Sequence, residues 1–212
     1  FEAIAAAVAE AALRGRLGDA ATSNASGERH KKLDLLANAF LAAACERGGH
    51  VAGLASEEEE APRLVQGRGA RARHLVAFDP LDGSSNVDVN VTVGSIFSIL
   101  RRDGDAAAPR PEEFLRPGAE QVCAGCALYG PATLLVLSVG RGVHGFTLDP
   151  RGGGFRLTHP DLRIPERTGE YAVNASNARR LLLKEFAIAG LNGLVWGGFA
   201  GVFAWWLYRG TG

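Results

Sequence analysis

The spacing of apolar residues predicts two helices near the start of the chain. Apolar positions recur at helical intervals over the alanine-rich residues 1–17 and again over residues 31–47, which end at a Gly-Gly pair. We expect the second helix to bury one side, formed by Leu33, Leu36, Phe40 and Ala44. Asp34 lies off that side and faces either solvent or a cleft, and the small polar residues 18–27 indicate a loop.

Strand patterns fill most of the chain beyond the second helix. We expect strands at 51–56, 74–78, 87–100, 123–129, 133–139, 143–148 and 155–158. The strand at 87 is placed by valines at alternate positions, and Gly140-Arg141-Gly142 is a hairpin signal. Residues 105–118, rich in proline, indicate a surface loop. Two helices followed by a strand-rich stretch with antiparallel hairpins support an α+β arrangement.

Acidic residues gather where two of these strands end. Asp79 and Asp82 follow the apolar run 74–78, and four glutamates, residues 57–60, follow the strand 51–56. Two aspartates this close repel each other unless a cation lies between them, and Mg²⁺ prefers such oxygen ligands. Pro80 restrains the backbone between them, which would let the Leu81 carbonyl serve as a third ligand. Asp-Pro dipeptides are also common in ordinary turns, and a run of glutamates is usually a solvated loop.

Small polar residues come directly after this acidic pair. Gly83, Ser84 and Ser85 offer backbone N–H groups and hydroxyls that suit a phosphate group, particularly if a helical turn begins there. Metal-binding acids followed by a phosphate-binding turn indicate metal-assisted phosphate chemistry. The same composition is frequent in loops without a function.

Composition and charge narrow the possible functions. The 212 residues hold 23 basic and 23 acidic side chains, a balance that disfavours nucleic-acid binding. Three cysteines are too few for a secreted disulfide scaffold and indicate a reducing compartment. Cys123 and Cys126 have CxxC spacing, but on a strand they would point to opposite faces, so we expect structural thiols. Methionine is absent even at position 1, which suggests that the sequence starts within a longer reading frame.

The stretch FDPLDGSSNVDVNVTVGSIFSIL resembles the signature region of class I fructose-1,6-bisphosphatases, within the Mg²⁺-dependent, lithium-sensitive sugar-phosphatase superfamily. Further blocks are similar to family blocks at family-like spacing: GERHKKLD, ASEE, ALYGPATLLVL, the Asp-Pro turn at Asp149 and YAVNASNAR. The resemblance therefore runs almost continuously from residue 1 to about residue 179. It implies the N-terminal half of that family's layered α+β fold, with two N-terminal helices packed on a largely antiparallel sheet.

The resemblance also implies roles for individual residues. The Mg²⁺ ligands would be Glu57, Asp79, the Leu81 carbonyl and Asp82, with Glu28 nearby on a loop. The attacking water would be activated by Asp34 and Glu58, while Glu59 and Glu60 remain solvated charges. The phosphate would be held by Asp82, Gly83, Ser84 and Ser85, and Asn174 would reach the other end of the substrate. The implied reaction is hydrolysis of the 1-phosphate of fructose 1,6-bisphosphate to fructose 6-phosphate by a metal-activated water, in gluconeogenesis or the Calvin cycle.

The chain departs from the family pattern after Arg179. We expect a phosphatase domain at 1–179, a connector of basic and apolar residues at 180–185, and a hydrophobic C-terminal helix at 186–208. The last segment contains no charged residue and is long enough to cross a bilayer, although it also fits a soluble hydrophobic terminus or an error in the gene model. Basic residues before the segment would keep the phosphatase part on the cytoplasmic or stromal side.

Two kinds of function follow from this organisation. The chain is either a truncated fructose-1,6-bisphosphatase with impaired activity, homo-oligomeric when full length, or a catalytically deficient, membrane-tethered binding module. A related sugar bisphosphate, sedoheptulose 1,7-bisphosphate, is an alternative substrate, which the Ser84-Ser85-Asn86 sequence mildly disfavours. After Arg179 the chain shows none of the family blocks that contact the sugar and the distal phosphate. In either case we expect this to lower activity, because such contacts supply binding energy that positions the reacting phosphate.

Overall fold

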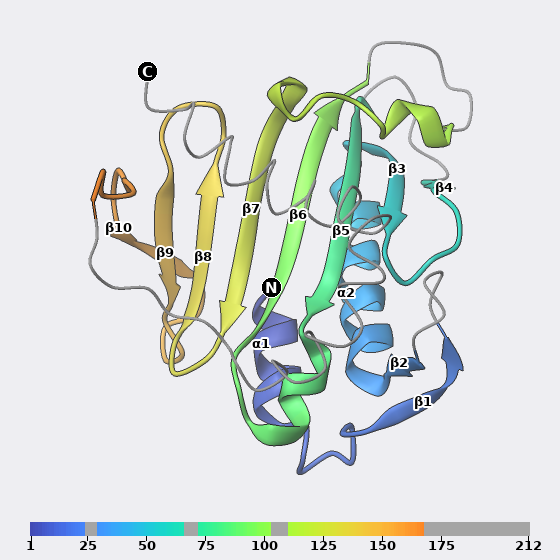
Figure 1. Cartoon of the computed structure of the whole chain (residues 1–212), viewed down its shortest axis with the longest axis vertical. Coiled ribbons are helices and arrows are strands. Elements are labelled where there is room, and N and C mark those ends of the chain that lie inside the picture. Colours follow the sequence, from blue (N-terminus) through green and yellow to red (C-terminus); the bar gives the residue numbers. More distant parts are fainter. Residues whose placement is uncertain (24–28, 66–71, 103–109, 168–212) are drawn as a thin grey trace. The chain divides into compact units, whose positions relative to one another are not determined.

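The computed structural model of the chain describes residues 1–23, 29–65, 72–102 and 110–167 (Figure 1). One compact unit spans Phe1–Asp161, and a second begins at Leu162. The predicted connector at 180–185 and the predicted hydrophobic helix at 186–208 lie outside the described residues, as do Glu28 and Asn174. Within the ranges given above, no helix has the length and apolar character needed to cross a membrane.

The first unit is organised around an eight-stranded sheet with the order β10-β9-β8-β7-β6-β5-β3-β4 (Figure 1). Its strands are β3 (Val51–Ser56), β4 (Arg63–Leu64), β5 (His74–Asp82), β6 (Val93–Arg101), β7 (Gln121–Tyr129), β8 (Thr133–Ser138), β9 (His144–Leu148) and β10 (Phe155–His159). Only β3 and β5 run parallel, and every other neighbouring pair in this sheet is antiparallel. The predicted α+β class with a largely antiparallel sheet is confirmed.

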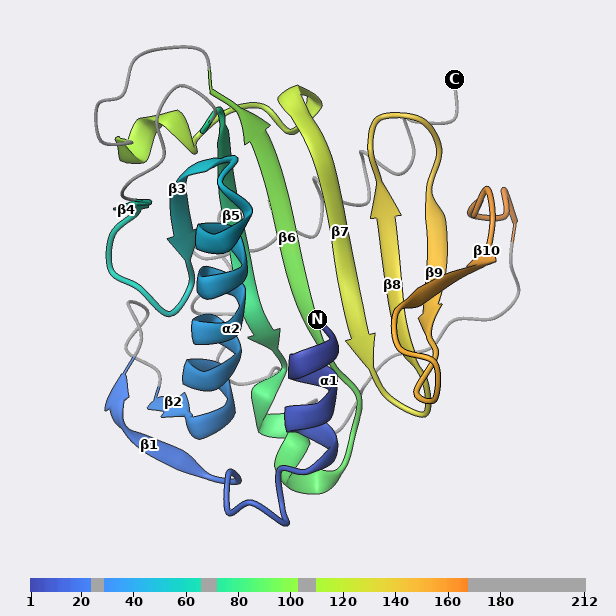
Figure 2. The ribbon, with the colours of Figure 1, turned by 180° about the vertical axis from the view of Figure 1, so that it is seen from behind.

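Two helices cover one face of this sheet (Figure 2). They are α1 (Glu2–Ala9) and α2 (Lys32–Gly48), and a two-stranded sheet of β1 (Asp19–Ser23) and β2 (Arg29–Lys31) precedes α2. Between helices and sheet lies a core of buried side chains that includes Ile4, Leu33, Leu54, Phe78 and Ala127. Burial of this apolar area is the main term that holds α2 in place, at roughly 25 cal/mol per Å².

The bounds of α2 were predicted more accurately from the sequence than those of α1. The second helix was predicted correctly to within a residue or two, and Gly49 ends it in the left-handed conformation at φ 74°. Ala44 is exposed, however, and Asp34 is buried. The first helix ends at Ala9 rather than at residue 17, since the following turns lead to Gly15 at φ 62°. The predicted loop at 18–27 contains the strand β1.

The strand predicted from residue 87 was wrong over its first half. Ser84–Val89 forms a 3-10 helix, η1, and Asn90 follows in the left-handed conformation at φ 57°, so β6 begins only at Val93. The alternating valines do not mark a buried face, because Val89 is 69% exposed. Hydrogen bonds to distant residues stabilise the 3-10 helix instead. The Asp88 carboxylate accepts hydrogen bonds from the Gly18 N–H at 3.1 Å and from Lys31 Nζ at 3.0 Å.

The remaining strands follow the prediction closely. The hairpin between β8 and β9 is confirmed, and Gly140 and Gly142 adopt positive φ angles in its turn. Cys123 and Cys126 on β7 are free and half-buried. The described part of the predicted loop at 105–118 contains two short 3-10 turns, η2 (Pro111–Glu113) and the start of η3 (Gly118–Glu120).

Candidate active site

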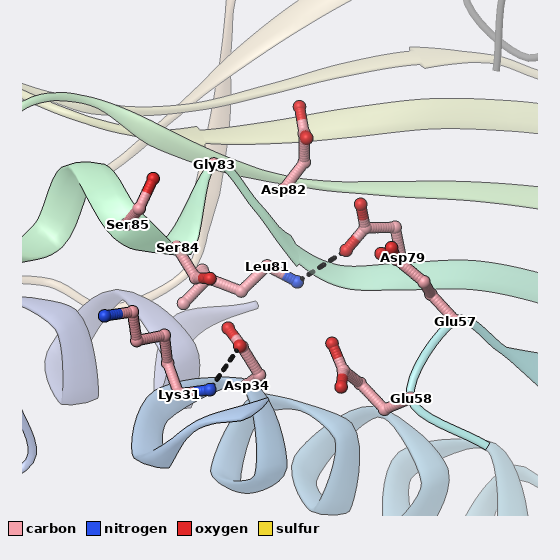
Figure 3. Close-up of a pocket in the computed structure, with 10 residues that line it drawn as sticks. All are labelled: Lys31, Asp34, Glu57, Glu58, Asp79, Leu81, Asp82, Gly83, Ser84 and Ser85. Atoms are coloured by element: carbon pink, nitrogen blue, oxygen red, sulfur yellow. Dashed lines mark hydrogen bonds between the residues drawn. The ribbon is translucent and has the colours of Figure 1, made fainter. Parts of the chain in front are cut away.

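A pocket of about 200 Å³ opens where β3 and β5 end beside the first turn of α2 (Figure 3). The residues that line it are Lys31, Asp34, Glu57, Glu58, Asp79, Leu81, Asp82, Gly83, Ser84 and Ser85. Every predicted site residue that the structure describes is in this group. Residues from three separate segments of the chain therefore converge, as the sequence analysis expected.

The parallel pairing of β3 with β5 brings the two acidic segments together. Ser56 lies opposite Phe78 at the end of this ladder, so the next residues along the two strands, Glu57 and Asp79, lie at the same edge of the sheet, although Asp79 still pairs with Ile96 on β6. The Glu57 N–H continues the pairing by donating a hydrogen bond to the Phe78 carbonyl at 3.2 Å. The ends of parallel strands meet at one edge, which is why the two motifs share a site.

A bulge in β5 shapes the backbone between the two aspartates. Asp79 lies opposite Ile96 and Asp82 opposite Gly94, so the register shifts between them. Pro80 has no N–H to donate, and the buried Ser95 hydroxyl holds its carbonyl with a hydrogen bond of 2.7 Å. The Leu81 N–H donates to Asp79 Oδ1 at 3.0 Å, which orients the aspartate side chain.

The electrostatic environment of Asp79 is strongly unfavourable for a negative charge. Burial is the largest cause, followed by the charge and hydrogen bond of Glu57 and the charge of Asp82, and together they raise the pKa of Asp79 to about 9. Figure 3 shows the carboxylates of Glu57 and Asp79 next to each other, while Asp82 points away from them. A cation between the first two side chains would relieve their repulsion.

The donor atoms at this point fit a hard divalent cation. Carboxylates and a backbone carbonyl are the ligands that Mg²⁺ prefers, and burial beside Glu57 raises the pKa of Asp79, which disfavours its charged form unless a cation is near. Across the part of the chain that the structure describes, however, no three His, Cys, Asp or Glu side chains come together closely enough to hold a metal. The arrangement thus has the right chemistry, with Asp82 turned away from the other two acids.

Asp34 is buried, not a solvated helix charge. Its side chain is 5% exposed, Oδ2 accepts a hydrogen bond of 2.8 Å from the Lys31 N–H at the start of α2, and Oδ1 is buried without a hydrogen-bond partner of normal length. Burial raises the pKa of Asp34, against the opposing effects of the Lys31 N–H and the Ser84 hydroxyl. Figure 3 shows the carboxylate pointing toward Ser84.

Lys31 and His30 form ion-pair contacts at the pocket that the sequence pattern did not indicate. Lys31 Nζ forms ion pairs with Asp19 at 2.7 Å and Asp88 at 3.0 Å, which ties β1 and η1 to the rim of the pocket. His30 Nε2 lies 2.7 Å from Glu58 Oε2, and both side chains are 6% exposed. Neither contact can be predicted from the spacing of nearby residues, because the partners lie far apart along the chain.

The glutamate run divides into residues with different surroundings. Glu57 and Glu58 line the pocket, and Glu60 is exposed as expected. The expectation that Glu59 is a solvated charge was wrong: its carboxylate binds Asn38 and Arg63. The backbone of the turn changes direction between Glu58 and Glu59, so identical neighbours in the sequence have different surroundings.

Gly83 is required by the backbone of the turn that follows the acids. It adopts φ 74°, the left-handed region in which a side chain is strained, and begins η1 with a hydrogen bond from the Asn86 N–H to its carbonyl at 2.8 Å. Ser84 and Ser85 therefore face the pocket from the first turn of η1, opposite the start of α2 (Figure 3).

Comparison with known proteins identifies the family. Residues 1–160 match the family model described as the fructose-1-6-bisphosphatase N-terminal domain. The chain belongs to the fructose-1,6-bisphosphatase family. This confirms the resemblance read from the signature region, and the match covers both acidic segments and the turn at 83–85.

Relatives and solved structures agree with this assignment. The chain is 54% identical over 178 residues to a class 1 fructose-1,6-bisphosphatase of Methylibium petroleiphilum, covering 84% of the chain and 50% of the relative. It is 55% identical over 158 residues to one of Hydrogenophilus thermoluteolus, covering 74% and 44% respectively. The holo form of Leishmania major fructose-1,6-bisphosphatase has a TM-score of 0.76 at 42% identity, covering 83% of this chain and 55% of that one. The chain spans about half the length of the curated relatives it matches.

Proposed function

We propose that this chain carries a large part of the catalytic site of an Mg²⁺-dependent fructose-1,6-bisphosphatase, a phosphoric monoester hydrolase. The proposed reaction is hydrolysis of the 1-phosphate of fructose 1,6-bisphosphate to give fructose 6-phosphate. The supporting observation is the pocket itself, in which acids from β3 and β5, Asp34 from α2 and the turn at 83–85 converge. Family membership supports the choice of substrate class.

The metal-binding part of the proposal rests on oxygen donors. Glu57, Asp79, Asp82 and the Leu81 carbonyl would hold Mg²⁺, and Glu28, outside the described residues, would add a further acid. Bound there, the metal would neutralise charge on the phosphate and make a water easier to deprotonate.

The chain's own residues would perform the proton transfer and hold the phosphate. Asp34 and Glu58 would orient the attacking water and accept its proton, and the raised pKa of Asp34 brings a carboxylate closer to the working pH of a general base. Gly83, Ser84 and Ser85 would hold the phosphate through N–H groups and hydroxyls, with Asp82 beside them. Asn174 would bind the far end of the sugar.

We expect the chain as it stands to be a weak enzyme. It matches about half the length of its curated relatives, so we infer that, apart from Asn174, it supplies few of the contacts to the distal part of the substrate. Binding energy from the remote end of a substrate helps to position the reacting end, and its loss lowers turnover as well as affinity.

Phosphate release from fructose 1,6-bisphosphate by the full chain, with Mg²⁺ and with a chelator, tests this proposal. We expect slow, Mg²⁺-dependent release that falls about 100-fold or more in Asp34→Asn, because the amide can still accept the Lys31 N–H but cannot take a proton. Glu60→Gln, an exposed change next to the same site, is the matched control and should leave the rate unchanged.

Four results would count against the proposal. Release that is independent of Mg²⁺, or unaffected by Asp34→Asn, would exclude the proposed roles. Absence of hydrolysis together with absence of Mn²⁺ binding would exclude the metal site in this chain. Faster release from sedoheptulose 1,7-bisphosphate would reassign the substrate.

A further inference from the structure

Glu59 has surroundings unlike those of the other three glutamates in its run. It is not among the residues that line the pocket, yet its side chain is only 25% exposed. Oε1 accepts a hydrogen bond of 3.1 Å from Asn38 Nδ2 on α2, and Oε2 forms an ion pair of 3.1 Å with Arg63 Nε on β4. Both oxygens of this carboxylate therefore bind other parts of the unit.

Asn38 uses both ends of its amide to hold the same turn. Its Nδ2 donates to Glu59, while its Oδ1 accepts a hydrogen bond of 2.8 Å from the Ser56 hydroxyl at the end of β3. Ser56 Oγ in turn accepts the Glu58 N–H at 3.2 Å. A single side chain on α2 is thus bonded to both sides of the turn that carries Glu58.

Arg63 and the backbone complete this connection. Arg63 Nη1 also forms an ion pair with Glu46 Oε1 on α2 at 2.7 Å, so β4 connects Glu59 to the helix by a second route. The Glu59 N–H donates to the Ser56 carbonyl at 3.2 Å, which closes the turn. Figure 2 shows α2 lying against β3 and β5, the arrangement that makes these contacts possible.

We propose that Glu59 is a positioning residue for the proposed active site. By binding Asn38 and Arg63 it holds the turn in the one conformation that directs Glu57 and Glu58 into the pocket. Without this anchor the turn would sample other conformations, and the two acids would no longer be pre-organised for a cation and a water. The effect on metal binding rests on the proposed function, whereas the anchoring of the turn does not.

Mn²⁺ binding to the full chain, followed by electron paramagnetic resonance, tests the functional part. Glu59→Ala is expected to raise the Kd for Mn²⁺ by about 10- to 100-fold, the usual effect of losing a partner that orients metal ligands. Glu60→Ala is the matched control, one residue along and exposed, and should change the Kd by less than about twofold. Glu59→Gln should recover most of the affinity, since its carbonyl can still accept the Asn38 amide.

Amide hydrogen exchange over residues 56–60 tests the anchoring directly. We expect exchange about 10-fold faster or more in Glu59→Ala, with Glu60→Ala unchanged. Should Glu59→Ala fold poorly, Asn38→Leu removes the same bond from the helix side and should speed exchange in the same segment. Equal exchange in the wild type and in both the Glu59→Ala and Asn38→Leu chains would overturn the proposal.

The two measurements separate the two claims. Wild-type chain that binds no Mn²⁺ would refute the proposed function, while faster exchange in Glu59→Ala would still support the anchor. Wild-type chain that binds Mn²⁺ with the same Kd as Glu59→Ala would refute the positioning role. Where turnover is measurable, the positioning role requires a lower kcat for Glu59→Ala with an unchanged KM, because Glu59 touches no part of the phosphate-binding turn.

Discussion

Replacing Asp79 by asparagine is expected to stabilise the metal-free chain and to remove its stabilisation by Mg²⁺. Burial, then Glu57 and Asp82, raise the pKa of Asp79 from its ordinary 3.8 to about 9. The unfolded chain loses this proton at the lower value and the folded chain keeps it to the higher one, so the folded chain binds more protons in between. Its stability therefore falls as the pH rises through this range.

The size of the effect follows from this shift. About three pKa units separate 3.8 from a neutral working pH, which sets an upper bound of about 4 kcal/mol at 1.36 kcal/mol per unit. Water reaches this partly exposed site and screens the charges of Glu57 and Asp82, so we expect about 1–3 kcal/mol. Asparagine keeps the hydrogen bond from the Leu81 N–H, which is 3.0 Å long in the wild type.

Urea unfolding of the full chain measures this directly. In the presence of a chelator, Asp79→Asn should have a larger free energy of unfolding than wild type. This difference should be larger at about pH 7 than at about pH 5. Excess Mg²⁺ should stabilise the wild type but not the variant, because only the wild type keeps the charged ligand. Glu60→Gln serves as the control for loss of an exposed charge. A variant less stable than wild type at pH 7 in chelator, or equal stabilisation of both by Mg²⁺, would refute the reasoning.

Three further predictions concern the scaffold and the C-terminal segment. Ser95→Ala should destabilise the chain by about 1–3 kcal/mol in urea unfolding, because the Pro80 carbonyl loses its 2.7 Å hydrogen bond inside the sheet; a change below about 0.5 kcal/mol would contradict this. The hydrogen bonds from Arg102 lower the pKa of Glu113 from 4.5 to about 2. The pair therefore stabilises the fold fully above pH 4.5, and this stabilisation is lost as the pH falls through about 2. Glu113→Gln should accordingly cost about 1–2 kcal/mol at neutral pH and converge with wild type near pH 2, and a pH-independent difference would exclude the ion pair as its cause. Finally, the full chain should partition into lipid vesicles while a chain ending at Arg179 stays in the aqueous phase; if both stay in the aqueous phase, the predicted span is wrong.

Features governed by near neighbours in the chain were predictable. The second helix has a continuous apolar side and a glycine to end it, and the hairpin between β8 and β9 has its glycines at the turn. The acidic motif from Asp79 to Ser85 is local as well, so its residue types alone indicated metal and phosphate chemistry. Such patterns are readable because a turn or a helix start depends on a few consecutive residues.

Features governed by distant contacts were not predictable in the same way. The alternating valines after residue 86 favoured a strand, but Asp88 bonds to Gly18 and Lys31 instead, and these bonds keep Ser84–Val89 in a 3-10 helix. The pattern contained no information about these partners, which lie far away along the chain.

What the sequence alone determined is the set of chemical groups and the family to which they belong. What only the tertiary structure decided is how neighbouring, similar groups are used. Glu58 enters the pocket against His30 and Glu59 is bound to α2, although the two residues are adjacent and identical. Asp34 is buried at the pocket, not solvated, because α2 begins beside the ends of β3 and β5. The physical reason is that direction and burial depend on which distant element packs against a residue, and local spacing does not encode that.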